Sequence, residues 1–193
     1  MRNLATARLR LEPVTALNAD VLWHLLQAAE LREFQDLPDM RLPSFIESVG
    51  RRPLHLASGQ HGRYEWLLYP NEGRECAGWI SLRIPEREPG GAEVGYSILA
   101  RFRRLGYATE AVSALLDEGF AHVRLQRICA YCVPENLASV ALLERLGFTR
   151  DITLPRGATV RGEPVDIVSY YLESCDWRTG LRRTLTSTDA NEK

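Results

Sequence analysis

EVGYSILARFRRLGYATEA, residues 93–111, is the stretch that decides the fold. Residues 93–99 predict a strand, residues 101–109 an arginine-rich, glycine-containing turn, and the residues from Ala108 to His122 a helix. The helix is expected because apolar side chains recur on one stripe, at Ala111, Val112, Leu115, Leu116 and Phe120. A strand that enters a helix through a tight turn is one unit of a sheet flanked by helices.

The turn has the features of a phosphate site. At a helix N-terminus several backbone N–H groups have no partner and the helix dipole is positive, so phosphate binds there readily. Gly106 and Ala108 remove side-chain bulk from the approach, and Arg103 and Arg104 add positive charge. A surface turn that merely caps an amphipathic helix stays open as the alternative. Neither G-x-G-x-x-G nor G-K-[ST] is present, which argues against a dinucleotide fold and a P-loop.

The rest of the chain predicts one mixed sheet flanked by helices. Expected strands are residues 8–13, 64–69, 77–84, 127–133, 148–154 and 165–172, and a loop with Gly157 and Gly162 joins the last two. A helix capped by Asn18 is expected over 21–29, a shorter one from a Ser44–Glu47 capping box, and a third over 137–146. Residues 1–175 therefore form a single domain. The polar segment 176–193 is expected to be a flexible tail.

Composition narrows the class of protein. The chain has 193 residues, 45% of them hydrophobic and 25% charged, with a net charge of −1. This balance fits a globular domain and gives no indication of a nucleic-acid partner. No apolar run resembles a signal peptide or a membrane span, so a cytoplasmic protein with no membrane partner is expected.

Cys129 and Cys132 form a C-x-x-C pair, which invites a zinc or redox interpretation. They fall in a strand-like run, however, where residues three apart point to opposite faces. No second pair completes a tetrahedral site. Buried apolar cysteines, and no metal, are therefore expected.

Four motifs in order resemble the GNAT superfamily of N-acetyltransferases, in particular its RimJ/RimL-like branch. RRLGYA (103–108) fits the [Q/R]-x-x-G-x-[G/A] acetyl-CoA signature, with EVGY before it and TEA after it. NLAS (136–139) matches the branch's N-x-x-S, ERLGF (144–148) its E-[KR]-x-G-F, and DIVSY (166–170) its last strand. The resemblance is tight over 76–172, looser over 8–75 and absent beyond 176.

The resemblance implies the acyl-CoA N-acyltransferase fold, an α/β (α+β) architecture. Its sheet is mixed, mostly antiparallel and twisted, with about seven strands flanked by about four helices. The fourth and fifth strands splay apart and leave a slot for the pantetheine arm of acetyl-CoA, and Gly95 suits a bulge there. The residues implied to bind this cosubstrate are Ile98, Leu99, Arg101, Arg103, Arg104, Gly106, Tyr107, Ala108, Thr109, Asn136 and Ser139.

The reaction implied by the family is direct transfer of the acetyl group to a primary amine. Ser139 is the candidate that steadies the departing thiolate, and Asn136 would bind the pantetheine or cap its helix, or both. Many superfamily members have a Tyr as general acid where this chain has Leu143. The loop carboxylate of RimL-like enzymes is missing from 156–159. Glu93, acting through water, is then the candidate base, with Glu163 as an alternative.

The acceptor stays open between a protein N-terminal amine and a small-molecule amine. Segments 34–46 and 155–164 are expected to face it, and their Asp36, Asp39, Arg41 and Glu163 fit a cationic amine. The missing Tyr and loop carboxylate leave a second hypothesis, a catalytically weak CoA-binding sensor of the same fold. Transfer of a longer acyl group such as succinyl is a third. The sequence leaves both a monomer and a homodimer open.

Overall fold

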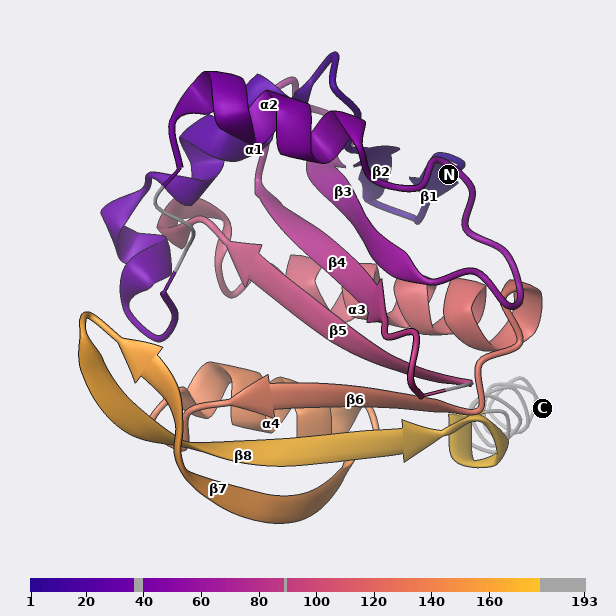
Figure 1. Cartoon of the computed structure of the whole chain (residues 1–193), viewed down its shortest axis with the longest axis vertical. Coiled ribbons are helices and arrows are strands. Elements are labelled where there is room, and N and C mark those ends of the chain that lie inside the picture. Colours follow the sequence, from indigo (N-terminus) through magenta and orange to yellow (C-terminus); the bar gives the residue numbers. More distant parts are fainter. Residues whose placement is uncertain (37–39, 89, 178–193) are drawn as a thin grey trace, which may run out of the picture.

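The computed structural model describes residues 1–36, 40–88 and 90–177. Eight strands form one open sheet in the order β1-β2-β3-β4-β5-β6-β8-β7, and Figure 1 shows helices packed on both of its faces. All neighbouring strands are antiparallel except β5 and β6, which are parallel. The mixed, mostly antiparallel sheet expected from the sequence is therefore confirmed.

The elements have the following bounds. The strands are β1 Leu4–Ala5, β2 Leu9–Pro13, β3 Gly62–Pro70, β4 Gly78–Ile84, β5 Gly91–Ile98, β6 Arg127–Cys132, β7 Thr149–Val160 and β8 Glu163–Glu173. The α-helices are α1 Ala19–Leu26, α2 Leu42–Gly50, α3 Tyr107–Asp117 and α4 Leu137–Arg145. Short 3-10 turns are η1 Ala29–Arg32 and η2 Ala100–Phe102, and a π-helical turn, η3 Glu118–His122, extends α3.

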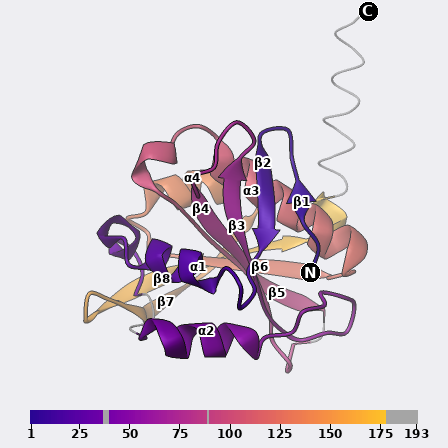
Figure 2. The same ribbon diagram turned by 90° about the horizontal axis from the view of Figure 1, so that it is seen from above.

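The helices divide into two layers, which Figure 2 shows from above. On one face α1 and α2 pack on Leu67 and Trp79 of the sheet. On the other face α3 and α4 cover alternate residues of the same strands, among them Trp66, Ile80 and Val94. Because successive side chains of a strand point to opposite faces, Arg63, Trp79 and Glu93 lie on the α1–α2 side.

The sheet splays between β5 and β6. These strands pair only at Gly91–Arg127, Ala92–Ile128 and Glu93–Cys129, and the pairing ends there. Beyond that point β5 continues its pairing with β4, while β6 pairs along its whole length with β8. One edge of β5 therefore faces an opening after Glu93. β5 and β6 correspond to the fourth and fifth of the seven strands expected from the sequence. The additional strand in the structure is the two-residue β1.

Three local expectations are wrong. Helix α2 begins at Leu42, with a proline in its first turn, so Ser44 does not cap it. The expected loop after residue 154 is extended hairpin instead, because β7 continues to Val160 and β8 starts at Glu163, with two register shifts absorbing the irregularity. Gly95 makes no bulge, since the β4–β5 register is unbroken. It does mark a close approach, as a Cβ there would lie 3.0 Å from Ser81 Oγ.

The ends of the chain add two observations. Trp177 packs against the main core, and its indole N–H donates to Asp117 Oδ1 at 2.8 Å. The rest of the predicted tail, 178–193, lies outside the described residues. Within the described ranges, no helix combines the length and the apolar character needed to cross a bilayer.

Candidate functional site

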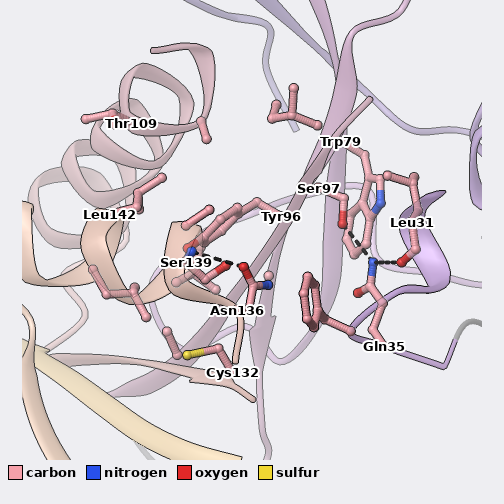
Figure 3. A pocket seen from close by; sticks show the side chains of 18 of the residues that line it. Leu31, Gln35, Trp79, Tyr96, Ser97, Thr109, Cys132, Asn136, Ser139 and Leu142 are labelled. Atoms are coloured by element: carbon pink, nitrogen blue, oxygen red, sulfur yellow. Dashed lines mark hydrogen bonds between the residues drawn. The ribbon is translucent and has the colours of Figure 1, made fainter. Parts of the chain in front are cut away.

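A cavity of about 880 Å³ occupies the opening between the splayed strands. Its walls come from β3, β4, β5, β6, α4, the segment that contains η1, and the turn and first residues of α3. Figure 3 shows side chains from both sides of the slot pointing into it. Glu93 lines it, and so do nine of the eleven residues predicted to bind CoA: Ile98, Arg103, Arg104, Gly106, Tyr107, Ala108, Thr109, Asn136 and Ser139. Ser139 was predicted for both roles.

The arginine-rich turn of residues 101–109, called the cationic turn below, is shaped by two residues with left-handed backbone. Gly106, the N-cap of α3, has φ 80° and Arg104 has φ 62°, so both are left-handed. The Nε of Arg103 donates to Ile98 O at 3.1 Å, which ties the turn to β5. The first backbone bond of α3 is Glu110 N–H to Gly106 O, so the N–H groups of residues 107–109 precede the helical ladder. Exposed Arg104 and these amides can together receive an anion.

Glu110 fixes the start of α3 from behind. Its carboxylate accepts hydrogen bonds from the backbone N–H and the Nε of Arg8, at 2.8 and 2.7 Å, and from the Thr6 hydroxyl. Arg8 also donates to Leu105 O at 2.8 Å and lies over the ring of Tyr107. The N-terminal strand segment therefore supports the turn, which the sequence did not indicate.

Helix α4 supplies the opposite wall. Asn136 is its N-cap, and the side-chain Oδ1 accepts a hydrogen bond from Ser139 N–H at 3.2 Å. The capping role predicted for Asn136 is thus confirmed. Asn136 and Ser139 are both half-buried and line the slot (Figure 3). One turn of helix therefore presents an amide and a hydroxyl to the same space.

Tyr96 of β5 is a polar side chain that the sequence analysis missed. Its ring crosses the slot towards Ser139, as Figure 3 shows. Its hydroxyl oxygen is buried and has no hydrogen bond of good geometry to any described residue. Burial raises the pKa of Tyr96 to about 12, an effect that the neighbouring Ser139 side chain partly opposes. The EVGY motif contained this tyrosine, but only the splay of the strands shows that it faces the serine.

Glu93 stands at the point where β5 and β6 part. Arg83 of β4 holds its Oε2 through Nη2 and, at 3.2 Å, through Nε. The other carboxylate oxygen, Oε1, has no hydrogen bond to a described residue. A proton could therefore reach Oε1, directly or through water, without breaking the ion pair.

Other predicted residues lie elsewhere. Leu99 and Arg101 are not in the cavity wall, because Leu99 packs in the α1–α2 core and Arg101 turns outward to Glu75. Glu163 is exposed at the start of β8 and does not line the cavity either. Of the segments expected to face the acceptor, Phe34 and Gln35 reach the cavity.

The tip of the β7–β8 hairpin contacts the segment that follows η1. Asp36 Oδ1 accepts a hydrogen bond from Arg161 N–H at 2.9 Å. The two acceptor-facing segments expected from the sequence therefore meet here, although residues 37–39 are outside the described part. Within the cavity, the amide of Gln35 donates to Ser97 Oγ at 2.8 Å.

The cysteines of the C-x-x-C pair separate as predicted. Cys129 lies opposite Tyr171 and Cys132 opposite Val168 of β8, and because they are three positions apart on β6 their side chains point to opposite faces. Both thiols are free, and they are half-buried instead of buried. Cys132 lines the cavity, and burial raises its pKa to about 11, with Arg150 opposing the shift. Among the described residues, no three His, Cys, Asp or Glu side chains are placed to share a metal ion.

Residues 8–149 match the domain family described as the Acetyltransferase (GNAT) domain. The chain belongs to the GNAT acetyltransferase family. The match includes the cationic turn and the α4 wall of the cavity. It stops at the first residue of β7.

Named relatives agree with this family. The chain is 28% identical over 176 residues to the uncharacterized N-acetyltransferase p20 of Bacillus licheniformis, covering 89% of this chain and 96% of that protein. It is 27% identical over 168 residues to the uncharacterized N-acetyltransferase YoaA of Bacillus subtilis, covering 86% and 94%. This GNAT protein therefore matches those proteins along nearly their whole length.

Solved structures confirm the fold. One is RimL, a ribosomal-protein alpha-N-acetyltransferase in complex with coenzyme A, with a TM-score of 0.78 at 20% identity over 91% of this chain and 99% of that one. Another is a chimera of the spermidine N-acetyltransferase SpeG from Vibrio cholerae and hSSAT, with a TM-score of 0.77 at 17% identity over 89% and 99%. At these identities the likeness establishes the architecture.

Proposed function

We propose that this GNAT protein transfers an acetyl group from acetyl-CoA directly to a primary amine. One observation carries the proposal: a single cavity joins the cationic turn before α3 to the neighbouring hydroxyl groups of Ser139 and Tyr96. A ligand with a diphosphate at one end and a thioester at the other fits such a cavity. The membership of this chain in the GNAT family also supports acetyl-CoA as the ligand.

The cosubstrate would be bound mainly by backbone groups. The diphosphate would accept hydrogen bonds from the amides of residues 106–109, with Arg104 adding charge. Asn136 would contact the pantetheine arm while it caps α4. The unpaired edge of β5 beyond Glu93 offers N–H and C=O groups to the amides of that arm, as a missing strand would. CoA found in complex with the RimL neighbour supports this ligand.

The chemistry then needs three contributions from the chain. A neutral amine attacks the thioester carbon, and a backbone N–H of β5 stabilises the oxyanion. Glu93 accepts the proton lost by the ammonium, directly or through water. As the C–S bond breaks, Ser139 donates a hydrogen bond to the thiolate, and Tyr96 positions the Ser139 hydroxyl. The thiolate then takes a proton from water, to which Glu93 gives up the proton it accepted. The products are the acetylated amine and free CoA.

The acceptor class is a primary amine, either a protein N-terminus or a small molecule. Two structural neighbours illustrate the range, since RimL is named for a protein N-terminus and SpeG for spermidine. Action in the cytoplasm, as a monomer or a homodimer, is part of the same proposal.

Two measurements test it. Acetyl-CoA at about 100 times its Kd should stabilise the protein by about 2.7 kcal/mol in a thermal-shift titration. With a panel of amines and N-terminal peptides, free thiol should then be released in an amine-dependent way, and less so in Ser139→Ala. Stabilisation without thiol release would make the protein a CoA-binding sensor. No stabilisation at all would refute the assignment of the cavity.

A further inference from the structure

A row of charged side chains crosses three strands beside the slot. In the sheet register Arg63 of β3 lies directly opposite Arg83 of β4, and Arg83 lies directly opposite Glu93 of β5. All three line the cavity on the α1–α2 side. Like charges directly opposite each other destabilise a sheet. The Arg63–Arg83 pair therefore has to be compensated by anions nearby.

The positive charge of the arginines is only partly balanced by neighbouring carboxylates. Glu93 is held by Arg83, and Glu65, only 3% exposed, is shared between Arg63 and Arg52. Three guanidinium groups thus meet two carboxylates, which leaves one positive charge over. Glu88 also acts on Arg83, but it is exposed in the turn before β5 and does not line the cavity.

The surplus charge falls on Arg63. Its Nε is bonded to Glu65 Oε1 at 2.9 Å, whereas its two Nη groups have no hydrogen bond to a described residue. Desolvation lowers the pKa of Arg63, with Glu93 opposing the shift and Arg83 adding to it. The side chain is nevertheless 46% exposed towards the cavity, and its guanidinium lies 5.8 Å from the ring centroid of Trp79. The Arg63 guanidinium therefore still has N–H groups that can donate hydrogen bonds to a ligand in the cavity.

Small side chains floor the space next to these arginines. Ser81 and Gly95 are opposite each other in the next row of the sheet, and any Cβ at Gly95 would press on Ser81 Oγ. A group bound by Arg63 therefore meets small side chains on the sheet surface beside it. A planar carboxylate matches the guanidinium fork in shape and charge, and a second cation would be repelled.

We propose that Arg63 and Arg83 bind a carboxylate carried by the acceptor, so that the substrates are amines with an acidic group. This inference rests on the proposed acetyl transfer. It applies to a free amino acid or to a protein N-terminus followed by an acidic residue. It replaces the sequence expectation of a generally cationic amine and disfavours polyamines.

Paired acceptors test the idea, with kcat/KM for CoA release as the readout. Peptides with free N-termini, Ala-Glu-amide and Ala-Gln-amide, form the protein arm. Alanine and alaninamide, which lacks the carboxylate, form the small-molecule arm. Spermidine is the cationic reference. In at least one arm the acidic member should be favoured by about 10-fold to 100-fold, the worth of one or two charge-assisted hydrogen bonds. The arm that responds identifies the source of the carboxylate.

Variants then locate the effect. Arg63→Gln should abolish the preference for the acidic member, measured as the ratio of kcat/KM between the two members of a pair, and Arg63→Lys should retain part of that preference. Arg127→Gln is the matched control, since Arg127 forms an exposed ion pair with Glu173 away from the cavity. The Arg127→Gln variant should keep the wild-type preference for the acidic member. If Arg63→Gln unfolds the protein, Arg83→Gln provides the comparison through the ratio of kcat/KM between acidic and neutral members alone, because Arg83 also holds Glu93 and its loss should lower both rates.

The outcomes separate the two proposals. Equal rates for acidic and neutral members, or a preference for spermidine, would overturn the carboxylate site while acetyl transfer stands. A preference that survives both Arg63→Gln and Arg83→Gln would also overturn it. Thermal stabilisation by acetyl-CoA with no acetylation of any amine would overturn both.

Discussion

Tyr96→Phe should make the protein more stable and slower. The hydroxyl oxygen is buried without a hydrogen bond of good geometry in the described part of the chain. A buried polar group left unsatisfied costs about 1–3 kcal/mol. Because Ser139 approaches the hydroxyl, we take the lower end, about 1 kcal/mol, as the gain. For a chain of this length that is a rise in Tm of about 2–4 °C.

The same change should lower kcat. A positioned acid contributes about 10²-fold to 10⁴-fold, and a group acting through Ser139 falls at the low end. We expect kcat to fall by about 10-fold or more, with little change in the affinity for CoA. Because burial raises the pKa of Tyr96 to about 12, its hydroxyl keeps its proton across pH 7–9. The kcat of the wild type should therefore not fall between pH 7 and pH 9 through deprotonation of Tyr96.

The assay pairs differential scanning fluorimetry with steady-state thiol release at saturating acetyl-CoA. Tyr171→Phe is the control, since Tyr171 is half-buried on β8 and does not line the cavity. It should leave kcat unchanged. A clear fall in Tm for Tyr96→Phe would mean that the hydroxyl has a partner in the native protein. An unchanged kcat would remove Tyr96 from the reaction.

Other perturbations address the rest of the cavity. Gly106→Glu should abolish CoA binding by calorimetry and cost about 1–2 kcal/mol of stability, because φ is 80° there and a Cβ would lie 3.1 Å from Arg8 Nη2; normal binding would show that the turn does not hold the diphosphate. Ser139→Ala should lower kcat more than CoA affinity, and an effect on affinity alone would reassign Ser139 to binding. Cys132, whose pKa is raised to about 11, should be alkylated by iodoacetamide slowly at pH 8 and much faster above pH 10. CoA should block this alkylation, which peptide mass spectrometry would measure, because Cys132 lines the cavity. Rapid labelling at pH 7 would contradict the assigned burial.

Much of the architecture could be predicted because it follows from local pattern. The strand, turn and helix of residues 93–117 show their periodicity and their turn residues directly, and Asn136 precedes an apolar run as an N-cap should. The β7–β8 hairpin could not be predicted in the same way. Arg156 and Gly157 look like loop residues and lie in the second register shift, but the pairing of β7 with β8 resumes from Ala158 to Val160. Tertiary pairing overrode the local signal.

The charged row beside the slot depends on cross-strand register. Arg63, Arg83 and Glu93 are separated by 20 and 10 positions in the sequence and have no shared motif. Only the alignment of β3, β4 and β5 places them side by side. The sequence therefore suggested a cationic acceptor from exposed carboxylates such as Glu163, which lies outside the cavity.

The position of Tyr96 bears on whether this chain is a sensor or an enzyme. In the sequence, Leu143 replaces the tyrosine that many superfamily members carry on this helix, and the structure buries Leu143 to 1% exposure in the cavity wall. Tyr96 reaches Ser139 from the opposite wall, so a tyrosine hydroxyl is available by another route. A double-mutant cycle decides whether it works through Ser139. If it does, Tyr96→Phe combined with Ser139→Ala should be no slower than Ser139→Ala alone, whereas additive losses in kcat would mean that Tyr96 and Ser139 act independently.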